Sequence, residues 1–230
     1  NLVWQVRSIG DYLPFVEAIR QWVHWQPREQ LRVALESTAA EIVKLAPEVE
    51  AKLGHIAPNP ALGASDARLR LFDNIARTFE RIAASRGLVL FLDDLHWADE
   101  STLSLLHYVL RHLRSSRVLV IGAYREVELD RKHPLASALV DWNREQLTTR
   151  IPLNRLTRED TTALLTSLFG EDSVSQGFGD LLYTETEGNP FFVEESVKAL
   201  IEQGNIYREN DAWERSELSE IAVPQSVKEA

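Results

Sequence analysis

Two adjacent carboxylates, Asp93 and Asp94, directly follow the apolar run Leu88–Leu92, and their types and position suit them to metal and nucleotide chemistry. An apolar run of this kind predicts a β-strand that is buried on both faces of a parallel sheet. Ligands of such sheets bind just beyond the carboxyl ends of the strands, so we expect Asp93 at the rim of a ligand site. A carboxylate there can hold Mg²⁺ through water against nucleotide phosphates, and Asp94 can orient an attacking water. The alternative is that the two acids only end the strand, because Asp is common in turns.

Short apolar runs alternate with long amphipathic segments along residues 1 to 156, which predicts an α/β domain with helices on both faces of a mostly parallel sheet. The predicted strands are residues 2–7, 88–93, 117–123 and 150–153. One predicted helix has an apolar stripe of helical spacing, with Ser65 or Asp66 as its cap and Gly87 at its end. The stripe consists of Phe72, Ile75, Ala76, Phe79, Ile82 and Ala83. Another helix follows Asp99 and completes a β-α-β unit.

The pattern changes after Leu156, where helical segments follow one another without strands. Thr157 to Asp160 resembles a capping box and predicts the start of a helix. Two more helical stretches are predicted, one around Leu181 and one over residues 190–203. Residues 205–207 and 212–214 then flank a polar turn and predict a short hairpin.

The string LVLFLDDLHWAD, residues 88–99, closely resembles the Walker B segment of STAND-type P-loop ATPases, which are related to the AAA+ class. It is most similar to the nucleotide-binding domains of large LuxR-type transcriptional regulators and to domains attached to bacterial cyclases. Residues 12–20 resemble the family's first helix after its second strand, and residues 121–125 resemble its sensor 1 strand. The resemblance implies a P-loop NTPase-like three-layer α/β core with a parallel sheet, followed by a small helical lid.

The resemblance also implies roles for three residues at the predicted strand ends. Asp93 would bind Mg²⁺ through water, and Asp94 would act as a catalytic residue that orients the attacking water. Arg125 would be the second catalytic residue, with its guanidinium on the terminal phosphate of ATP. The alternative for Arg125 is a surface side chain that pairs with the neighbouring Glu126 or Glu128.

Residues 187–195 predict a strong helix start, because Asn189 can cap the helix and Pro190 suits its first position. That local reading needs no ligand. The segment is similar to the lid turn of the family, whose Gly-x-Pro proline packs against adenine. The resemblance therefore makes Gly188, Asn189 and Pro190 candidate cofactor-binding residues.

The sequence contains no phosphate-binding loop of the form G-x-x-x-x-G-K-[ST]. None of its lysines, Lys44, Lys52, Lys132, Lys198 and Lys228, follows a glycine. In the family this loop precedes the strand that residues 2–7 resemble. Since the chain also starts at Asn1 and has no Met, we expect a fragment that lacks Walker A and binds ATP poorly by itself.

These expectations divide the chain into a truncated P-loop core with Walker B and sensor 1 (1–156), a helical lid (157–204) and the start of a further module such as a winged helix (205–230). The expected function is that of a nucleotide-dependent signalling ATPase, a regulatory switch of a transcriptional regulator or signalling enzyme. The intact parent would hydrolyse ATP, whereas this chain alone would be inactive. One alternative is an inactive NTPase-like scaffold for protein–protein contacts, and a second is an origin-binding or helicase-loading ATPase.

The expected partners are ATP or ADP, other domains of the parent protein and further copies of the chain when nucleotide is bound. The excess of 35 acidic over 25 basic residues argues against direct nucleic-acid binding by this segment. No apolar run approaches the length of a membrane span, and the absence of Cys fits a reducing cytoplasm. Of the six histidines, only His96 follows the acids closely; it would either report nucleotide state or pack under the loop. The others lack the spacing of a zinc site.

Overall fold

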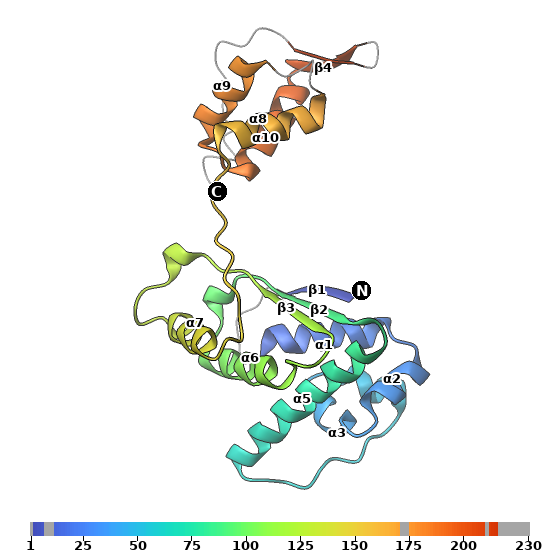
Figure 1. The fold of residues 1–230 in the computed structure, drawn as a ribbon. Helices are drawn as coiled ribbons and strands as arrows, with labels where there is room; N and C mark the ends of the chain where they lie inside the picture. The colour runs from blue at the N-terminus through green and yellow to red at the C-terminus, as the bar shows by residue number, and fades with distance from the viewer. Residues whose placement is uncertain (1, 7–11, 171–174, 210–211, 216–230) are drawn as a thin grey trace. The chain divides into compact units, whose positions relative to one another are not determined.

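The computed structural model describes residues 2–6, 12–170, 175–209 and 212–215 (Figure 1). The chain forms two compact units, Asn1–Arg150 and Ile151–Ala230. Each unit has its own cluster of buried apolar side chains. The two units are therefore described separately.

The first unit is built around a parallel sheet whose three strands have the order β1-β2-β3. The strands are β1 (Leu2–Val6), β2 (Leu88–Leu92) and β3 (Val118–Gly122). The strands predicted at residues 2–7, 88–93 and 117–123 are confirmed, with β2 in the central position. In the register of β2 and β3, Leu88 pairs with Val118 and Leu92 pairs with Gly122, so the two strands end level with each other.

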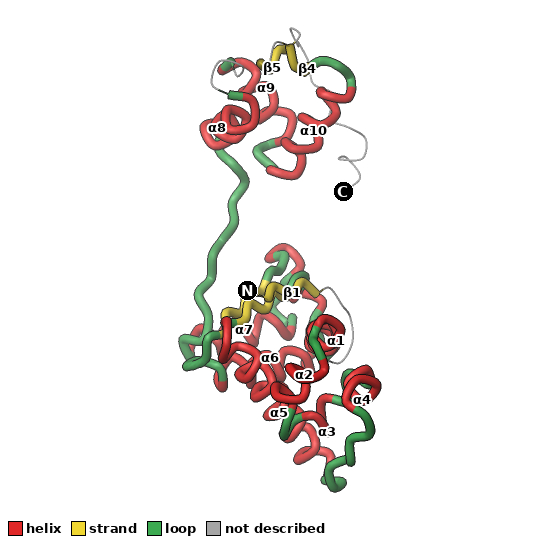
Figure 2. Tube along the Cα trace, turned by 90° about the vertical axis from the view of Figure 1, so that its right-hand side faces the viewer, coloured by secondary structure: helices red, strands yellow, loops and turns green. Residues whose placement is uncertain are grey.

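The helices that pack on this sheet lie on one of its faces (Figures 1 and 2). They are α1 (Leu13–Trp25), α5 (Ala64–Arg86), α6 (Glu100–His112) and α7 (Pro134–Arg144). Leu88, Leu90 and Leu92 are buried on this face, while Leu119 and Ile121 on the other face are 56% and 43% exposed. The α/β class with a parallel sheet is confirmed. The predicted third layer is wrong for the described residues, because none of their helices covers the face of Leu119.

The predicted strand at residues 150–153 is also wrong, since these residues form no strand. Ile151 is 76% exposed and Leu153 is 92% exposed. A strand is stable only when its backbone groups pair with a neighbour, and no strand of the described ranges pairs with this segment. A short apolar run alone therefore predicted a strand that does not form.

Helix α5 confirms the predicted apolar stripe, because all six of its residues are buried. Its start differs from the prediction: the helix begins at Ala64 after Gly63, and no side chain caps it. Ser65 and Asp66 lie inside the first turn instead. Gly87 ends the helix with a φ of 76°, a left-handed backbone that favours glycine, and the N–H of Leu88 then donates to the Arg117 carbonyl.

Three short helices between α1 and α5 form a helical insert, consisting of α2 (Arg28–Leu35), α3 (Ala39–Ile42) and α4 (Glu48–Leu53). Lys52 of α4 donates hydrogen bonds to three carbonyls at the end of α1, those of Val23, His24 and Gln26. A cation at a helix carboxyl end also interacts favourably with the helix dipole. This side chain therefore ties the insert to α1.

The described part of the second unit contains three helices and a hairpin. The helices are α8 (Arg158–Phe169), α9 (Gln176–Thr186) and α10 (Pro190–Glu202), and the antiparallel strands are β4 (Ile206–Glu209) and β5 (Ala212–Arg215). The capping box of Thr157 and Asp160 is present, and the predicted hairpin is confirmed. Ile206 of the hairpin joins the buried cluster of the helices. Most of the module expected after residue 204, residues 210–211 and 216–230, lies outside the described residues.

Candidate functional site

The carboxyl ends of β2 and β3 form one rim, and hydrogen bonds continue to join the chain beyond both strands. The N–H of Ala123 donates to the Leu92 carbonyl at 2.8 Å, and the N–H of Leu95 donates to the Ala123 carbonyl at 2.9 Å. Asp93 therefore leaves the central strand at the same edge where the chain runs from Ala123 towards Arg125. This placement of Asp93 and the Arg125 segment agrees with the prediction from the sequence.

The two carboxylates lie in a tight turn between β2 and the short helix η1 (Leu95–Trp97). Asp94 has a left-handed backbone, with φ 54° and ψ 39°, and its N–H donates to Oδ1 of Asp93 at 3.0 Å. Asp tolerates this conformation better than most residues, because its short polar side chain bonds locally. The Asp93 side chain is half-buried, and the Asp94 side chain is mostly covered. The strand and the tight turn after it therefore both fix the position of the two acids at the rim.

His96 lies beneath this turn with its imidazole fully covered. Its Nδ1 accepts the N–H of Arg125 at 3.3 Å. Its Nε2 lies 3.9 Å from Oδ1 of Asp94 and 3.5 Å from Oε2 of Glu128. The neighbouring Trp97 is exposed, so His96, rather than Trp97, is the ring packed under the loop.

Arg125 follows β3 and precedes the short helix η2 (Glu126–Glu128). Its side chain is 66% exposed, and Nη1 lies 3.7 Å from Oε1 of Glu128. Glu126 pairs instead with Arg150. The surface pairing weighed for Arg125 from the sequence is therefore present. An exposed pair of this kind is weak, so it does not prevent the guanidinium from reaching an anion.

The residues predicted for the lid turn lie in the second unit, between α9 and α10. Gly188 is buried with φ 71°, and a Cβ there would lie 2.1 Å from the Leu156 carbonyl oxygen. The N–H of Leu156 donates to the Gly188 carbonyl at 2.8 Å, and Arg155 pairs with Glu187 beside it. Sequence reasoning missed this pairing, because it joins residues about thirty positions apart. Gly188 is therefore required by the backbone alone.

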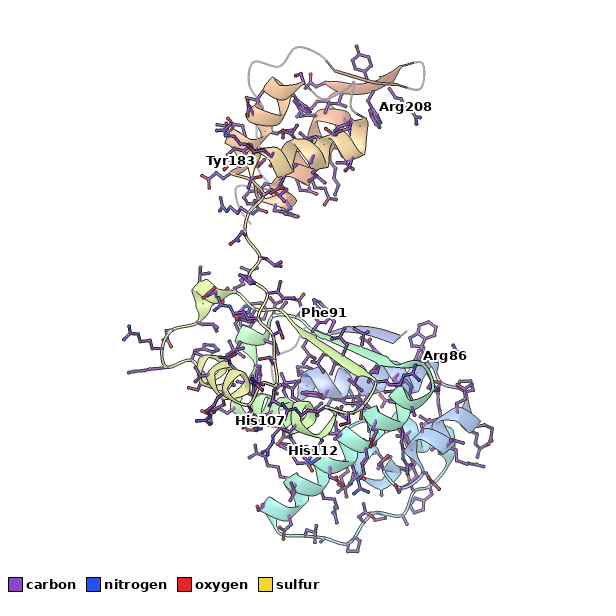
Figure 3. The ribbon with its side chains drawn as sticks, in the orientation of Figure 1. Arg86, Phe91, His107, His112, Tyr183 and Arg208 are labelled. Atoms are coloured by element: carbon purple, nitrogen blue, oxygen red, sulfur yellow. The ribbon has the colours of Figure 1, made fainter. Side chains whose placement is uncertain are left out.

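Asn189 and Pro190 differ in their surroundings. The Asn189 side chain accepts the N–H of Phe191 at 3.1 Å, which confirms the predicted cap of α10. Pro190 occupies the first turn of α10, and its side chain is exposed together with that of Phe191. Next to this turn, the Tyr183 ring, which Figure 3 labels, lies close to Gly188, and the Arg158 guanidinium is 4.6 Å from the ring centre. Of the three predicted residues, Pro190 thus remains accessible to a ligand.

Comparison with known protein families gives one match that covers the rim. The model of the AAA ATPase domain matches residues 6–121, just over half of the chain. The chain belongs to the AAA ATPase domain family. Comparisons with curated proteins and with solved structures give no significant match.

The matched range of this AAA ATPase domain contains the turn from Asp93 to Trp97 and nearly all of β3. Membership of this family indicates a nucleotide-dependent ATPase domain. Such domains bind ATP, usually together with Mg²⁺. Arg125 and residues 188–190 lie beyond the match. Their roles in nucleotide binding therefore rest on their geometry and on the resemblance described above.

The donor set at the rim fits Mg²⁺ that is held largely through water. Asp93 and Asp94 offer the hard carboxylate oxygens that this ion prefers, but they are too few to replace its water shell. Bound Mg²⁺ would neutralise phosphate charge there. The Arg125 guanidinium fits a single phosphate contact. No group of three or more metal-ligating side chains occurs among the described residues.

A hollow elsewhere in the AAA ATPase domain does not compete with the rim as a candidate site. An open hollow of about 260 Å³ lies at the opposite ends of β2 and β3, next to Gly87 and Arg117, and no carboxylate lines it.

No helix in the described ranges has the length and apolar character needed to cross a membrane.

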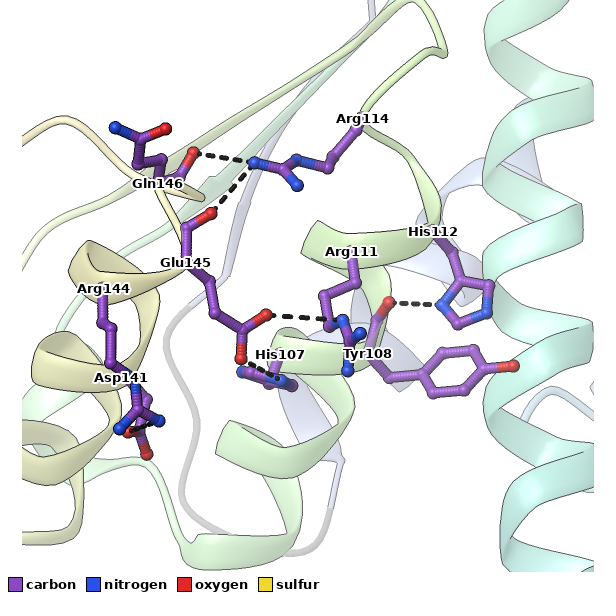
Figure 4. Close-up of polar contacts among 9 residues, drawn as sticks. All are labelled: His107, Tyr108, Arg111, His112, Arg114, Asp141, Arg144, Glu145 and Gln146. Carbon is purple, nitrogen blue, oxygen red and sulfur yellow. Dashed lines mark hydrogen bonds and ion pairs between the residues drawn. The ribbon is translucent and has the colours of Figure 1, made fainter.

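A second polar cluster joins the end of α7 to α6 (Figure 4). Glu145 pairs with His107 at 3.7 Å and with Arg111 at 3.4 Å. Arg114 donates to the carbonyls of Glu145 and Gln146. These contacts satisfy the carbonyls that directly follow α7 and give the cluster a role in packing.

Proposed function

We propose that this chain is part of a nucleotide-dependent signalling switch, in which ATP binding at the rim of β2 and β3 alters the output of a larger protein. Membership of the AAA ATPase domain family supports the nucleotide, and the acidic turn at the end of the central strand supports its location. The signalling role follows from the resemblance of residues 88–99 to LuxR-type regulators and cyclase-associated domains. Oligomerisation on nucleotide binding belongs to the same proposal.

Each residue of the proposed site has one task. Asp93 holds Mg²⁺ through water, and Asp94 orients the water that attacks the terminal phosphate. Arg125 exchanges its exposed pairing with Glu128 for that phosphate. Pro190 packs against adenine, while Gly188 and Asn189 shape the turn that presents it.

The observation that carries this proposal is the shared rim. Leu92 and Gly122 are register partners, so the acids after β2 and the cation after β3 lie at one edge of the sheet. In open parallel sheets this edge is where ligands bind. A scaffold that used the fold only for protein contacts would need neither the acids nor the cation at this edge.

Binding to the chain itself is expected to be weak, because its sequence contains no G-x-x-x-x-G-K-[ST] loop to cradle the phosphates. A titration of the ¹⁵N-labelled chain with Mg·ATP, followed by NMR, suits affinities of about a millimolar. We expect shift changes at residues 93–97, 124–128 and 189–191. The changes at the first two segments should shrink in Asp93→Asn and in Arg125→Gln.

The matched control for Arg125 is Arg150→Gln, since Arg150 pairs with Glu126 of the same short helix. This variant should leave the titration unchanged. Shift changes that spread over other surfaces, or none at all, would favour the scaffold function. Calorimetric affinity in the micromolar range would contradict the expected weakness of binding.

A further inference from the structure

The His96 imidazole connects three segments that meet at the rim. It is fully covered, and three polar residues of the described ranges lie beside it: Asp94 after β2, Arg125 after β3 and Glu128 in η2. Buried polar side chains of this kind hold their surroundings in a defined arrangement when their partners are in place. The contacts of His96 therefore bear on how the water-orienting acid and the cation are positioned.

The direction of the contacts assigns the proton of the ring. Because the N–H of Arg125 donates to Nδ1, Nδ1 is the acceptor, and the neutral ring carries its hydrogen on Nε2. This Nε2–H lies near two carboxylates, at 3.5 Å from Glu128 and 3.9 Å from Asp94. Neither contact is a full hydrogen bond, and Nε2 is a buried donor without another partner among the described residues. A small approach of either carboxylate would therefore be favourable.

Glu128 has a second neighbour, because its Oε1 lies 3.7 Å from Nη1 of Arg125. A carboxylate that shares its charge with a guanidinium is a poorer acceptor for the imidazole. Loss of the guanidinium leaves Glu128 with an uncompensated charge and makes it the better acceptor. The partner of Nε2–H thus depends on where the Arg125 side chain lies.

We propose that His96 is a positioning residue that couples Arg125 to Asp94 through Glu128. When Arg125 pairs with Glu128, the Nε2–H lies between Asp94 and Glu128 without a full hydrogen bond to either, as in this structure. When Arg125 moves to a phosphate, Glu128 takes the Nε2–H, and Asp94 is left to orient water. The coupling depends on the proposed function for its purpose, because that function gives Asp94 and Arg125 their tasks.

The coupling can be tested without nucleotide by a double-mutant cycle on the whole chain. Arg125→Gln mimics departure of the guanidinium from Glu128, and NMR follows the Asp94 amide and the His96 ring nitrogens. We expect the Nε2–H tautomer in the unsubstituted chain and a shift of the Asp94 amide in Arg125→Gln. In a His96→Asn or Glu128→Gln background this shift should fall by at least about threefold.

His96→Asn keeps an acceptor near the position of Nδ1 for the Arg125 N–H, so the fold is expected to persist. If it does not, Glu128→Gln breaks the same connection at a partly exposed residue. Arg150→Gln is the matched control, since it removes an arginine that pairs with Glu126 and leaves His96 untouched. It should not move the Asp94 amide.

An Nδ1–H tautomer, or an Asp94 shift that is equal in all backgrounds, would overturn the coupling. This outcome is separate from a failure of the proposed function. If the coupling is lost but the Mg·ATP titration is normal, only the inference about His96 is contradicted. If Mg·ATP causes no shift changes but the double-mutant cycle shows the coupling, only the nucleotide site is contradicted.

Discussion

Gly122 lies directly against Leu95: a Cβ added to Gly122 would be 2.5 Å from Leu95 Cδ1. Gly122 is the last residue of β3, and Leu95 is the first residue of η1. The close approach lets the turn that carries Asp94 and His96 sit on the end of the neighbouring strand. The absence of a side chain at Gly122 is therefore part of how the rim is built.

Gly122→Ala is expected to destabilise the first unit by about 1–3 kcal/mol, because the added methyl group would clash with the buried Leu95 side chain, which must then shift. Urea unfolding followed through NMR signals of that unit measures the cost. In the double variant with Leu95→Ala the total should be smaller than the sum of the two single effects, since the clash is gone. Strict additivity would show that Leu95 is not the obstacle.

Gly188→Ala should destabilise the second unit more than Gly204→Ala does. Both glycines have a left-handed backbone, with φ 71° and 73°, but only Gly188 faces another backbone, that of Leu156. The shared φ penalty is about 1–2 kcal/mol, and the clash adds to it in Gly188→Ala alone. Thermal unfolding of the two variants gives the difference. Equal melting temperatures of the two variants would contradict the close approach of the Leu156 carbonyl to Gly188.

Glu41→Gln should destabilise the chain at neutral pH, because Glu41 is a buried carboxylate that accepts hydrogen bonds from Lys44 and Asn59 and pairs with Arg70. Burial raises the pKa of Glu41, but the hydrogen bonds from Lys44 and Asn59 and the charges of Lys44 and Arg70 outweigh it, so the pKa is lowered from 4.5.

A carboxyl with a lowered pKa in the folded state stabilises the fold above its unfolded pKa and loses this effect as the pH falls through the folded value. The difference in unfolding free energy between the unsubstituted chain and Glu41→Gln should thus be full at pH 7 and shrink below about pH 4.5. Urea unfolding over this range measures it. Glu29→Gln, which removes an exposed partner of Arg32, is the control and should change stability little at any pH.

Asp94→Asn should be more stable than Asp94→Ala by about 1 kcal/mol, since Asn adopts the left-handed backbone of residue 94 more readily than Ala. Both variants lose the same charge next to His96, so the charge does not contribute to the difference between them. Chemical denaturation of the two chains is the measurement. A more stable Ala variant would mean that residue 94 has an ordinary helical or extended backbone.

Most of the first unit could be predicted from the sequence because its signals are local. The apolar run before Asp93, the stripe of α5 and the helix start after Asp99 are set by neighbouring residues, and the structure confirms them. The capping box at Thr157 in the second unit is local in the same way. Residues 150–153 misled the prediction because a strand exists only through its partner. The start of α5 misled it because Gly63 precedes the polar residues that were expected to cap the helix.

The contacts around the candidate site were harder to predict. Arg125 and His96 are 29 positions apart, and nothing in the local pattern of either residue indicates that they meet. The only signal was the place of His96 shortly after the acids, which left both a role in the site and simple packing open, with packing the commoner case. The structure shows a buried ring with contacts to both strand ends, which the sequence could not distinguish from a ring that merely fills space.

Lys52 shows how much of the helical insert depends on one amine. Its Nζ donates hydrogen bonds to the carbonyls of Val23, His24 and Gln26 at 2.7, 2.8 and 3.0 Å. Acetylation of this lysine would cancel its charge and leave a single N–H for three oxygens. A chemical change at one side chain would thereby weaken the connection between α4 and α1.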